Sequence, residues 1–170
     1  MSGFSDTWLI VPCYNEGTVI FDVLTNARET FPNIVGVNDG SADDSAAQIR
    51  AAGAHLVDHP VNLGQGAAIQ TGVEYARAQP GAKYFVTFDA DGQHQVKDVM
   101  RMIERLRTEP LDIIVGTRFA GQENSQVPWI KRAVLKTVVM LSPRTKKLGL
   151  TDAHNGLRAF NRRAVSYTHL

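Results

Sequence analysis

Short apolar runs alternate along this chain with segments in which apolar residues recur at helical spacing. A run of about four to eight apolar residues bounded by turn residues is typical of a buried strand, and apolar positions at i, i+3, i+4 and i+7 predict an amphipathic helix. The alternation predicts an α/β domain with a mainly parallel, doubly wound sheet flanked by helices and a ligand site at the carboxyl ends of the strands. The predicted strands cover residues 8–11, 34–37, 55–57, 84–88 and 113–115, and the predicted helices cover residues 18–30, 46–52, 64–78 and 96–107.

The fourth predicted strand ends in two carboxylates, Asp89 and Asp91, which are separated by Ala90. Carboxylates spaced in this way at the end of a buried strand can both turn toward one hard cation, and the amide oxygen of Gln93 can join them. Mg²⁺ or Mn²⁺ held by so few protein oxygens keeps coordination positions open for substrate phosphates. We therefore predict chemistry on a diphosphate.

Three other interpretations of this carboxylate pair are weaker. Both aspartates could cap a turn or the following helix, since acidic turn residues are common. A phosphatase of the haloacid dehalogenase type needs Thr or Val where this chain has Gln93. A calcium loop needs Gly at its sixth position and Glu at its twelfth, which are His94 and Met100 here. Each of the last two alternatives therefore lacks a residue that it requires.

Composition limits the classes of function. With 170 residues and 44% apolar content, the chain can bury one full core, and we expect one domain over residues 1–165. A net charge of +1 with interspersed signs lacks the basic patch typical of nucleic-acid binding, so no nucleic-acid partner is expected. The single cysteine, Cys13, excludes an internal disulfide, and no run reaches transmembrane length or has the pattern of a signal peptide. We expect a cytoplasmic protein.

Polar residues and glycines follow each of the first four predicted strands. Parallel strands end at the same edge of a sheet, so these loops are expected to lie together. An aromatic ring can stack on a base, carboxylates and amides can bind ribose or base edges, and glycines let a backbone approach closely. With the metal pair they predict a nucleotide diphosphate site, although each loop alone is ordinary turn chemistry. The residues are Pro12, Tyr14, Asn15, Glu16, Asp39, Gly40, Asn62, Gly66, Asp89, Ala90 and Asp91.

Six motifs occur in order along the chain and together resemble the family 2 glycosyltransferases, which have the Rossmann-like GT-A fold. The resemblance covers nearly the whole chain and is closest to the branch that includes the dolichyl- and polyprenyl-phosphate hexose synthases. The motifs are VPCYNE at residues 11–16, NDGS at 38–41, NLGQGA at 62–67, DADGQH at 89–94, GTRF at 116–119 and TDAHNGLR at 151–158.

The resemblance implies a role for each matching position. The positions that hold the base and ribose of a sugar nucleotide match Pro12, Tyr14, Glu16 and Asp39. The metal and diphosphate site, with Mg²⁺ or Mn²⁺ as cofactor, matches Asp89, Asp91 and Gln93. Arg118 matches a basic position near the phosphates or the acceptor. Asp152 is a candidate general base or ligand of a sugar hydroxyl, and a turn-forming aspartate is an equally good interpretation of it.

The resemblance implies a metal-dependent, inverting glycosyltransferase that moves a hexose from UDP- or GDP-hexose to an acceptor, with polyprenyl phosphate as our first expectation. Two alternatives stay open. One is transfer to a sugar hydroxyl in polysaccharide or glycolipid synthesis, and the other is a nucleotide-sugar-binding module without turnover. A dinucleotide oxidoreductase is disfavoured, because Gly64-x-Gly66-x-x-Ile69 lacks the third small residue of that fingerprint.

The chain departs from the family pattern at two places. Many relatives have Asp at the position of Asn38, so a weaker or different nucleoside contact is expected there. The pattern runs through residues 160–165 and breaks at Ser166. We therefore expect residues 166–170 to be foreign and the natural chain to be truncated at this point.

The segment from Pro128 to Leu141 bears on the acceptor and on location. Apolar and basic residues fall on opposite faces of a predicted helix there. Such a helix can lie on a membrane surface, which would bring the protein into peripheral contact with the inner face of the membrane. A core-packing helix with a solvated basic face is the other interpretation, and the sequence alone favours it somewhat.

Overall fold

The computed structural model of the chain describes residues 3–90, 96–116 and 157–167. Contacts divide the chain into two compact units, Met1–Val115 with Gly156–Leu170 and Gly116–Asn155, and all helices and strands described below belong to the first unit. The strands are β1 (Thr7–Cys13), β2 (Asn33–Asp39), β3 (His55–His59), β4 (Tyr84–Thr87), β5 (Ile113–Val115) and β6 (Arg158–Asn161). The helices are α1 (Ile20–Arg28), α2 (Ser45–Ala51), α3 (Gln65–Arg77), α4 (Val96–Thr108) and α6 (Arg162–Tyr167).

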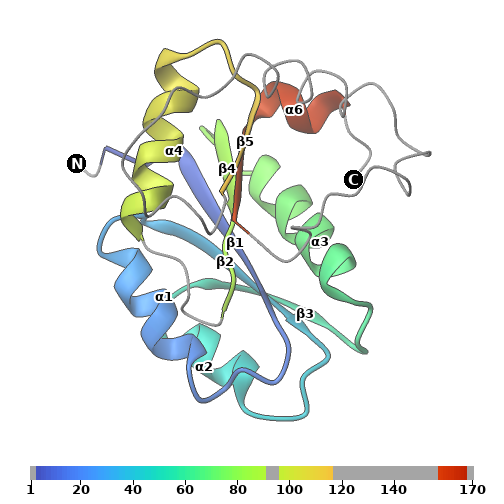
Figure 1. Ribbon diagram of the computed structural model, residues 1–170. Helices are drawn as coiled ribbons and strands as arrows, with labels where there is room; N and C mark the ends of the chain where they lie inside the picture. Colours follow the sequence, from blue (N-terminus) through green and yellow to red (C-terminus); the bar gives the residue numbers. More distant parts are fainter. Residues whose placement is uncertain (1–2, 91–95, 117–156, 168–170) are drawn as a thin grey trace. The chain divides into compact units, whose positions relative to one another are not determined.

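Within the described residues, six strands form one sheet in the order β3-β2-β1-β4-β6-β5 (Figure 1). The strands from β3 to β4 pair in parallel, whereas β6 is antiparallel to both β4 and β5. The predicted α/β fold with a mainly parallel, doubly wound sheet is confirmed. Strand β6 and helix α6 were not predicted, because the four residues of β6 carry only two apolar side chains and give no clear period.

The two faces of the sheet bury different side chains, because successive residues of a strand point to opposite faces. Along β1, Leu9 and Val11 join a core cluster with residues of α1, α2 and α4. Trp8 and Ile10 join a second cluster with residues of α3 and α6. Helices therefore cover both faces of the sheet, which is why the strands read as nearly continuous apolar runs (Figure 1).

The predicted helices lie where expected and differ at their ends. Helix α1 begins at Ile20 and ends at Arg28, two residues inside each predicted boundary. Helix α4 keeps the predicted start and runs one residue farther, to Thr108. Its predicted apolar face is confirmed by the buried side chains Val99, Met102, Ile103 and Leu106.

Strand β1 is the point at which the order of the strands reverses. It pairs with β2 on one side and with β4 on the other. In an open α/β sheet, the loops that follow the strands on either side of such a point diverge and leave a crevice at the carboxyl ends. This crevice is where the fold positions a ligand.

Several predictions concern residues outside those that the structure describes, including the helix from Pro128 to Leu141. The single domain over residues 1–165 and the foreign tail over 166–170 also stay predictions. Helix α6 includes Ser166 and Tyr167. None of the helices described here is both long enough and apolar enough to cross a membrane.

Candidate functional site

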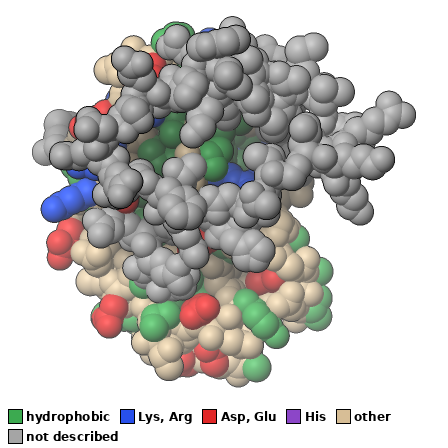
Figure 2. Space-filling view, viewed as in Figure 1, with side chains coloured by type: hydrophobic (Ala, Val, Ile, Leu, Met, Phe, Trp, Pro, Cys, Tyr) green, Lys and Arg blue, Asp and Glu red, His purple; other side chains and the backbone are tan. Residues whose placement is uncertain are grey.

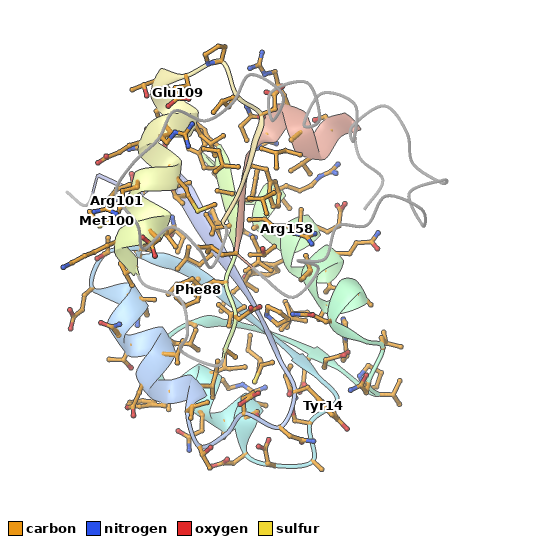
Figure 3. All side chains as sticks on the ribbon, in the orientation of Figure 1. Tyr14, Phe88, Met100, Arg101, Glu109 and Arg158 are labelled. Atoms are coloured by element: carbon orange, nitrogen blue, oxygen red, sulfur yellow. The ribbon has the colours of Figure 1, made fainter. Side chains whose placement is uncertain are left out.

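A pocket of about 350 Å³ opens at the carboxyl ends of β1, β2 and β4. The lining residues come from the ends of β1 and β2, from the loops after β1, β3 and β4, and from the first turns of α3. Tyr14, labelled in Figure 3, stands just beyond the end of β1 with 50% of its surface exposed. The lining residues are Pro12, Tyr14, Glu16, Asp39, Asn62, Gln65, Ala68, Asp89 and Ala90. The structure thus brings together residues that the sequence spreads over four loops.

Asn15 holds two of these loops together and does not line the pocket. Its backbone N–H donates to Oγ of Ser41 at 2.9 Å, and its Oδ1 accepts from the N–H of Ala42 at 2.9 Å. Its φ of 55° lies in the left-handed region, which asparagine tolerates better than most residues. The next N–H, that of Glu16, donates to Oγ of Ser45 at 3.0 Å. These bonds hold the Tyr14–Glu16 segment against the loop after β2.

Asp39 is the most constrained carboxylate of the pocket. It is 3% exposed, and it accepts hydrogen bonds from the N–H groups of Leu63 at 2.9 Å and Gly64 at 2.8 Å. Nδ1 of His59 lies 2.8 Å from its Oδ1. Burial by itself raises the pKa of the Asp39 carboxyl. The hydrogen bonds from two backbone amides and from His59 together lower this pKa by more than burial raises it, so the pKa lies below its usual value. Asp39 is therefore a fixed, ionised acceptor.

The predicted glycines have different roles. Gly40 has a φ of +69°, and a Cβ added there would lie 2.4 Å from the carbonyl carbon of Val61, so the glycine lets the loop after β3 pack against the end of β2. Gly40 does not line the pocket. Gly66, in the first turn of α3, has open space at the position of an added Cβ. Asn62 lines the pocket, and its Oδ1 accepts from the N–H of Gly64 at 3.0 Å.

Asp89 lies two residues beyond the end of β4, and the strand order places β4 on the other side of β1 from β2. The backbone N–H of Phe88 donates to the carbonyl of Ile10 at 2.8 Å, which fixes this end of β4 beside β1. Nε2 of Gln65 donates a long hydrogen bond of 3.4 Å to Oδ1 of Asp89. A carboxylate oxygen in a polar pocket is a suitable ligand for Mg²⁺ or Mn²⁺, so this part of the predicted metal site fits the ion.

The rest of the predicted metal site and both predicted catalytic residues lie outside the described residues. These are Asp91, Gln93, Arg118 and Asp152. Among the described residues, no three His, Cys, Asp or Glu side chains come together in a way that could hold a metal ion. The assignments of these four residues stay predictions.

Four residues that shape the site were not predicted from the sequence. Gln65 and Ala68 line the pocket from α3, and His59 and Thr71 lie behind Asp39. Two signals could have found them. Gln65 and Ala68 are three residues apart and so share one face of a helix, and His59 ends β3 as Asp39 ends β2.

Asn38 does not line the pocket. Its Nδ2 donates to Oδ1 of Asp58 on the neighbouring strand at 2.6 Å, and the two residues are register partners. The Oδ1 of Asn38 is buried and has no hydrogen-bond partner in the part of the chain that the structure describes. An aspartate here would place two carboxylates against each other. Asn38, where the chain departs from the family pattern, can therefore donate the hydrogen bond that Asp58 accepts.

The lining residues that the structure describes give the pocket an acidic surface. Its lining includes the carboxylates of Glu16, Asp39 and Asp89, and none of its described lining residues is Lys or Arg. Figure 2 shows acidic side chains over the surface of α1 and α2. The three described carboxylates would repel a diphosphate, and a cation bound between them would offset this repulsion.

Residues 8–167 match the family model described as glycosyl transferase family 2. An uncharacterized protein of Methanocaldococcus jannaschii is 33% identical over 162 residues, which cover 94% of this chain and 66% of that protein. The UDP-N-acetylglucosamine–dolichyl-phosphate N-acetylglucosaminyltransferase of Methanococcus voltae is 29% identical over 93% of this chain and 70% of its own length.

A solved structure, the glucosyl-3-phosphoglycerate synthase from Mycobacterium tuberculosis with Mn²⁺, UDP and phosphoglyceric acid, superimposes with a TM-score of 0.63 at 20% identity. The match covers 94% of this chain and 56% of the solved chain. At that identity the likeness shows a shared fold. This chain spans about two thirds of the first two relatives' length and just over half of the solved chain.

Proposed function

The chain belongs to glycosyl transferase family 2, and from this premise we propose that it is a metal-dependent, inverting hexosyltransferase with a nucleotide-sugar donor and polyprenyl phosphate as acceptor. The observation that carries the proposal is the pocket itself. Its lining combines an exposed aromatic ring, the fixed carboxylate of Asp39 at the end of β2, and a second carboxylate, Asp89, which follows β4 on the other side of β1. A nucleoside diphosphate with a bound cation needs these groups: a ring and a hydrogen-bond acceptor for the nucleoside, and a carboxylate that can hold the cation beside the phosphates.

The nucleoside would bind at the end of the pocket formed by β1 and β2. The Tyr14 ring is half exposed and offers a face on which a base can stack. Asp39 and Glu16 accept hydrogen bonds, and ribose hydroxyls and base N–H groups can donate them. The three residues sit on loops that are tied together through Asn15 and Ser45, so the nucleoside would meet a preformed surface.

The diphosphate would bind at the Asp89 end of the pocket. Asp89, with Asp91 and Gln93, would hold Mg²⁺ or Mn²⁺, and the ion would offset the negative charge that grows on the departing nucleoside diphosphate as the glycosidic bond breaks. Gln65 would hold the Asp89 side chain through its amide. Gly66 leaves room beside the first turn of α3 for a phosphate to approach the backbone.

The acceptor is proposed from the relatives. The Methanococcus voltae protein is named for transfer to dolichyl phosphate, which has the same chemistry as polyprenyl phosphate. A lipid phosphate is already anionic and needs no base to attack the sugar, so Asp152 would position groups rather than take a proton. A lipid acceptor would bring the chain to the inner face of the cytoplasmic membrane, with the segment from Pro128 to Leu141 as the proposed contact.

A donor screen tests the proposal. We expect one UDP- or GDP-hexose, with Mn²⁺, at about 100 times its Kd to raise the melting temperature by roughly 5–10 °C, because ligand binding at that excess adds about 2.7 kcal/mol to the free energy of unfolding. Transfer of labelled hexose from that donor to polyprenyl phosphate should then be seen. A chain that no nucleotide sugar stabilises would contradict the proposal, and stabilisation without transfer or hydrolysis would favour the binding-module alternative.

A further inference from the structure

A hydrogen-bond chain runs from the pocket wall into the protein. Oδ1 of Asp39 lies 2.8 Å from Nδ1 of His59, and Nε2 of His59 lies 2.9 Å from Oγ1 of Thr71. His59 is the register partner of Asp39 on β3, and Thr71 lies in the second turn of α3. The chain therefore joins three elements, and only its first member lines the pocket.

The direction of the hydrogen bond between Asp39 and His59 follows from the chemistry of Asp39. Its pKa is held low, so the carboxylate is ionised and can only accept. Nδ1 of His59 must then carry a proton and donate to Asp39. The hydroxyl of Thr71 can accept from or donate to Nε2, so it holds the ring in either case. The side chains of His59 and Asp39 are only 9% and 4% exposed, so little water competes for these bonds.

Within the part of the chain that the structure describes, these bonds leave Asp39 with one acceptor position unused. A carboxylate has about four lone-pair sites, two on each oxygen. His59 and the Leu63 amide occupy Oδ1, and the Gly64 amide occupies one site of Oδ2. The remaining site on Oδ2 belongs to a residue that lines the pocket. A ligand group that meets Asp39 must therefore be a hydrogen-bond donor.

We infer that His59 and Thr71 are positioning residues for nucleoside recognition, which hold Asp39 so that its free oxygen site reads one donor group of the nucleoside. This inference rests on the proposed function, because it needs the nucleoside to bind at the Asp39 end. In the proposed function the phosphates and the cation bind at Asp89, which follows β4 on the other side of β1, and Asp89 is not a member of this chain of hydrogen bonds. Loss of the Thr71 hydroxyl therefore weakens nucleoside binding and spares pyrophosphate binding.

Thr71→Val and Thr71→Ser provide the matched test, because valine keeps the shape and removes the hydroxyl while serine keeps the hydroxyl. Calorimetry with UDP, GDP and Mn²⁺-pyrophosphate is the measurement. We expect Thr71→Val to weaken binding of the preferred nucleoside diphosphate about three- to tenfold, as for a lost buried hydrogen bond, and to leave Mn²⁺-pyrophosphate within twofold. Thr71→Ser should bind both within twofold of the wild type.

A double-mutant cycle separates positioning from simple loss of structure. If Thr71 acts through Asp39, the double variant Asp39→Asn/Thr71→Val binds nucleoside diphosphate no more weakly than Asp39→Asn alone. Additive losses, equal losses for pyrophosphate, or no loss in Thr71→Val would each overturn the inference. A wild type that binds neither UDP nor GDP would instead overturn the proposed function, so the two failures are distinguishable.

Discussion

Asn38 and Asp58 form a side-chain hydrogen bond of 2.6 Å between the ends of β2 and β3. Asn38 is 5% exposed, so its partner cannot be replaced easily by water. We expect Asn38→Asp to lower the free energy of unfolding by about 1.5–3 kcal/mol at pH 7.5, because it removes a hydrogen bond to a charged group and sets two carboxylates against each other. Urea unfolding measures the loss.

The reciprocal exchange is the control for this pair. Asn38→Asp combined with Asp58→Asn restores a donor opposite an acceptor and should recover at least half of the lost stability. If the single and double variants were equally unstable, the hydrogen bond to Asp58 would not be the reason that asparagine suits position 38.

The proposed metal site is tested at Asp91. Replacing Asp91 by Ala should lower turnover on the order of a hundredfold or more, as does removal of other preorganised charge stabilisers. The wild type in excess EDTA should lose activity, and added Mn²⁺ or Mg²⁺ should restore it. Asp98→Ala is the control, because Asp98 is an exposed residue of α4 that forms a long ion pair of 3.9 Å with Arg101. Full activity of Asp91→Ala or in EDTA would refute the metal assignment.

Replacement by alanine should have different effects at two glycines of α3, Gly66 and Gly72. A Cβ at Gly66 would meet open space, whereas a Cβ at Gly72 would lie 2.5 Å from Cγ2 of Ile10. We expect Gly66→Ala to leave the free energy of unfolding unchanged or slightly higher and to weaken nucleoside diphosphate binding about tenfold. Gly72→Ala should lower stability by about 1–3 kcal/mol through overpacking.

Thermal unfolding and calorimetry on both variants distinguish the two effects. Unchanged ligand affinity in a stable Gly66→Ala variant would show that no ligand group approaches this turn, and the proposed phosphate position would be wrong.

Acid should destabilise the chain through Asp39 and Asp43. The hydroxyl and the backbone N–H of Ser45 donate hydrogen bonds to Asp43, and these bonds lower the pKa of its carboxyl. The pKa of Asp39 is also lowered. A carboxyl with a lower pKa in the folded state binds fewer protons when folded, so its stabilising effect is full above the unfolded pKa and is lost as pH falls through the folded pKa. Stability should therefore fall as the pH drops below 3.8, the ordinary value of both groups.

The measurement is chemical unfolding of the wild type and of Asp43→Asn at roughly pH 2 to pH 6. This range brackets the ordinary pKa of aspartate, near which the stability should fall. The variant should be less stable at pH 6 and should lose less stability on acidification. Parallel curves for the two proteins would show that Asp43 does not contribute to the acid transition.

Asp152 distinguishes the two acceptor classes. A hydroxyl acceptor must lose a proton as it attacks, so Asp152→Asn should cost about a hundredfold to ten-thousandfold in rate if Asp152 is its base. A phosphate acceptor should be affected less, unless Asp152 also holds the donor sugar. Donor affinity measured in the same variant separates these cases. Intact donor binding with abolished transfer to a hydroxyl acceptor would contradict the polyprenyl phosphate proposal.

The sequence by itself determined the fold class and the edge of the sheet where the site lies. Strand and helix periods are local properties, so an alternation of the two predicts parallel strands, and parallel strands end at one edge. That is why the local pattern is enough to group Tyr14, Glu16, Asp39 and Asp89, and the pocket contains all four.

The tertiary structure alone decided what each residue of those loops does. Asn15 and Gly40, grouped with the ligand-binding residues, tie loops together, while Gln65 lines the pocket and His59 with Thr71 supports Asp39. Strand β6 was also visible only in the tertiary structure. Its residues show no clear strand period, and pairing with β4 and β5 makes them a strand. Hydrogen bonds between residues 12 to 29 positions apart depend on strand register and helix placement, and a local sequence pattern contains neither.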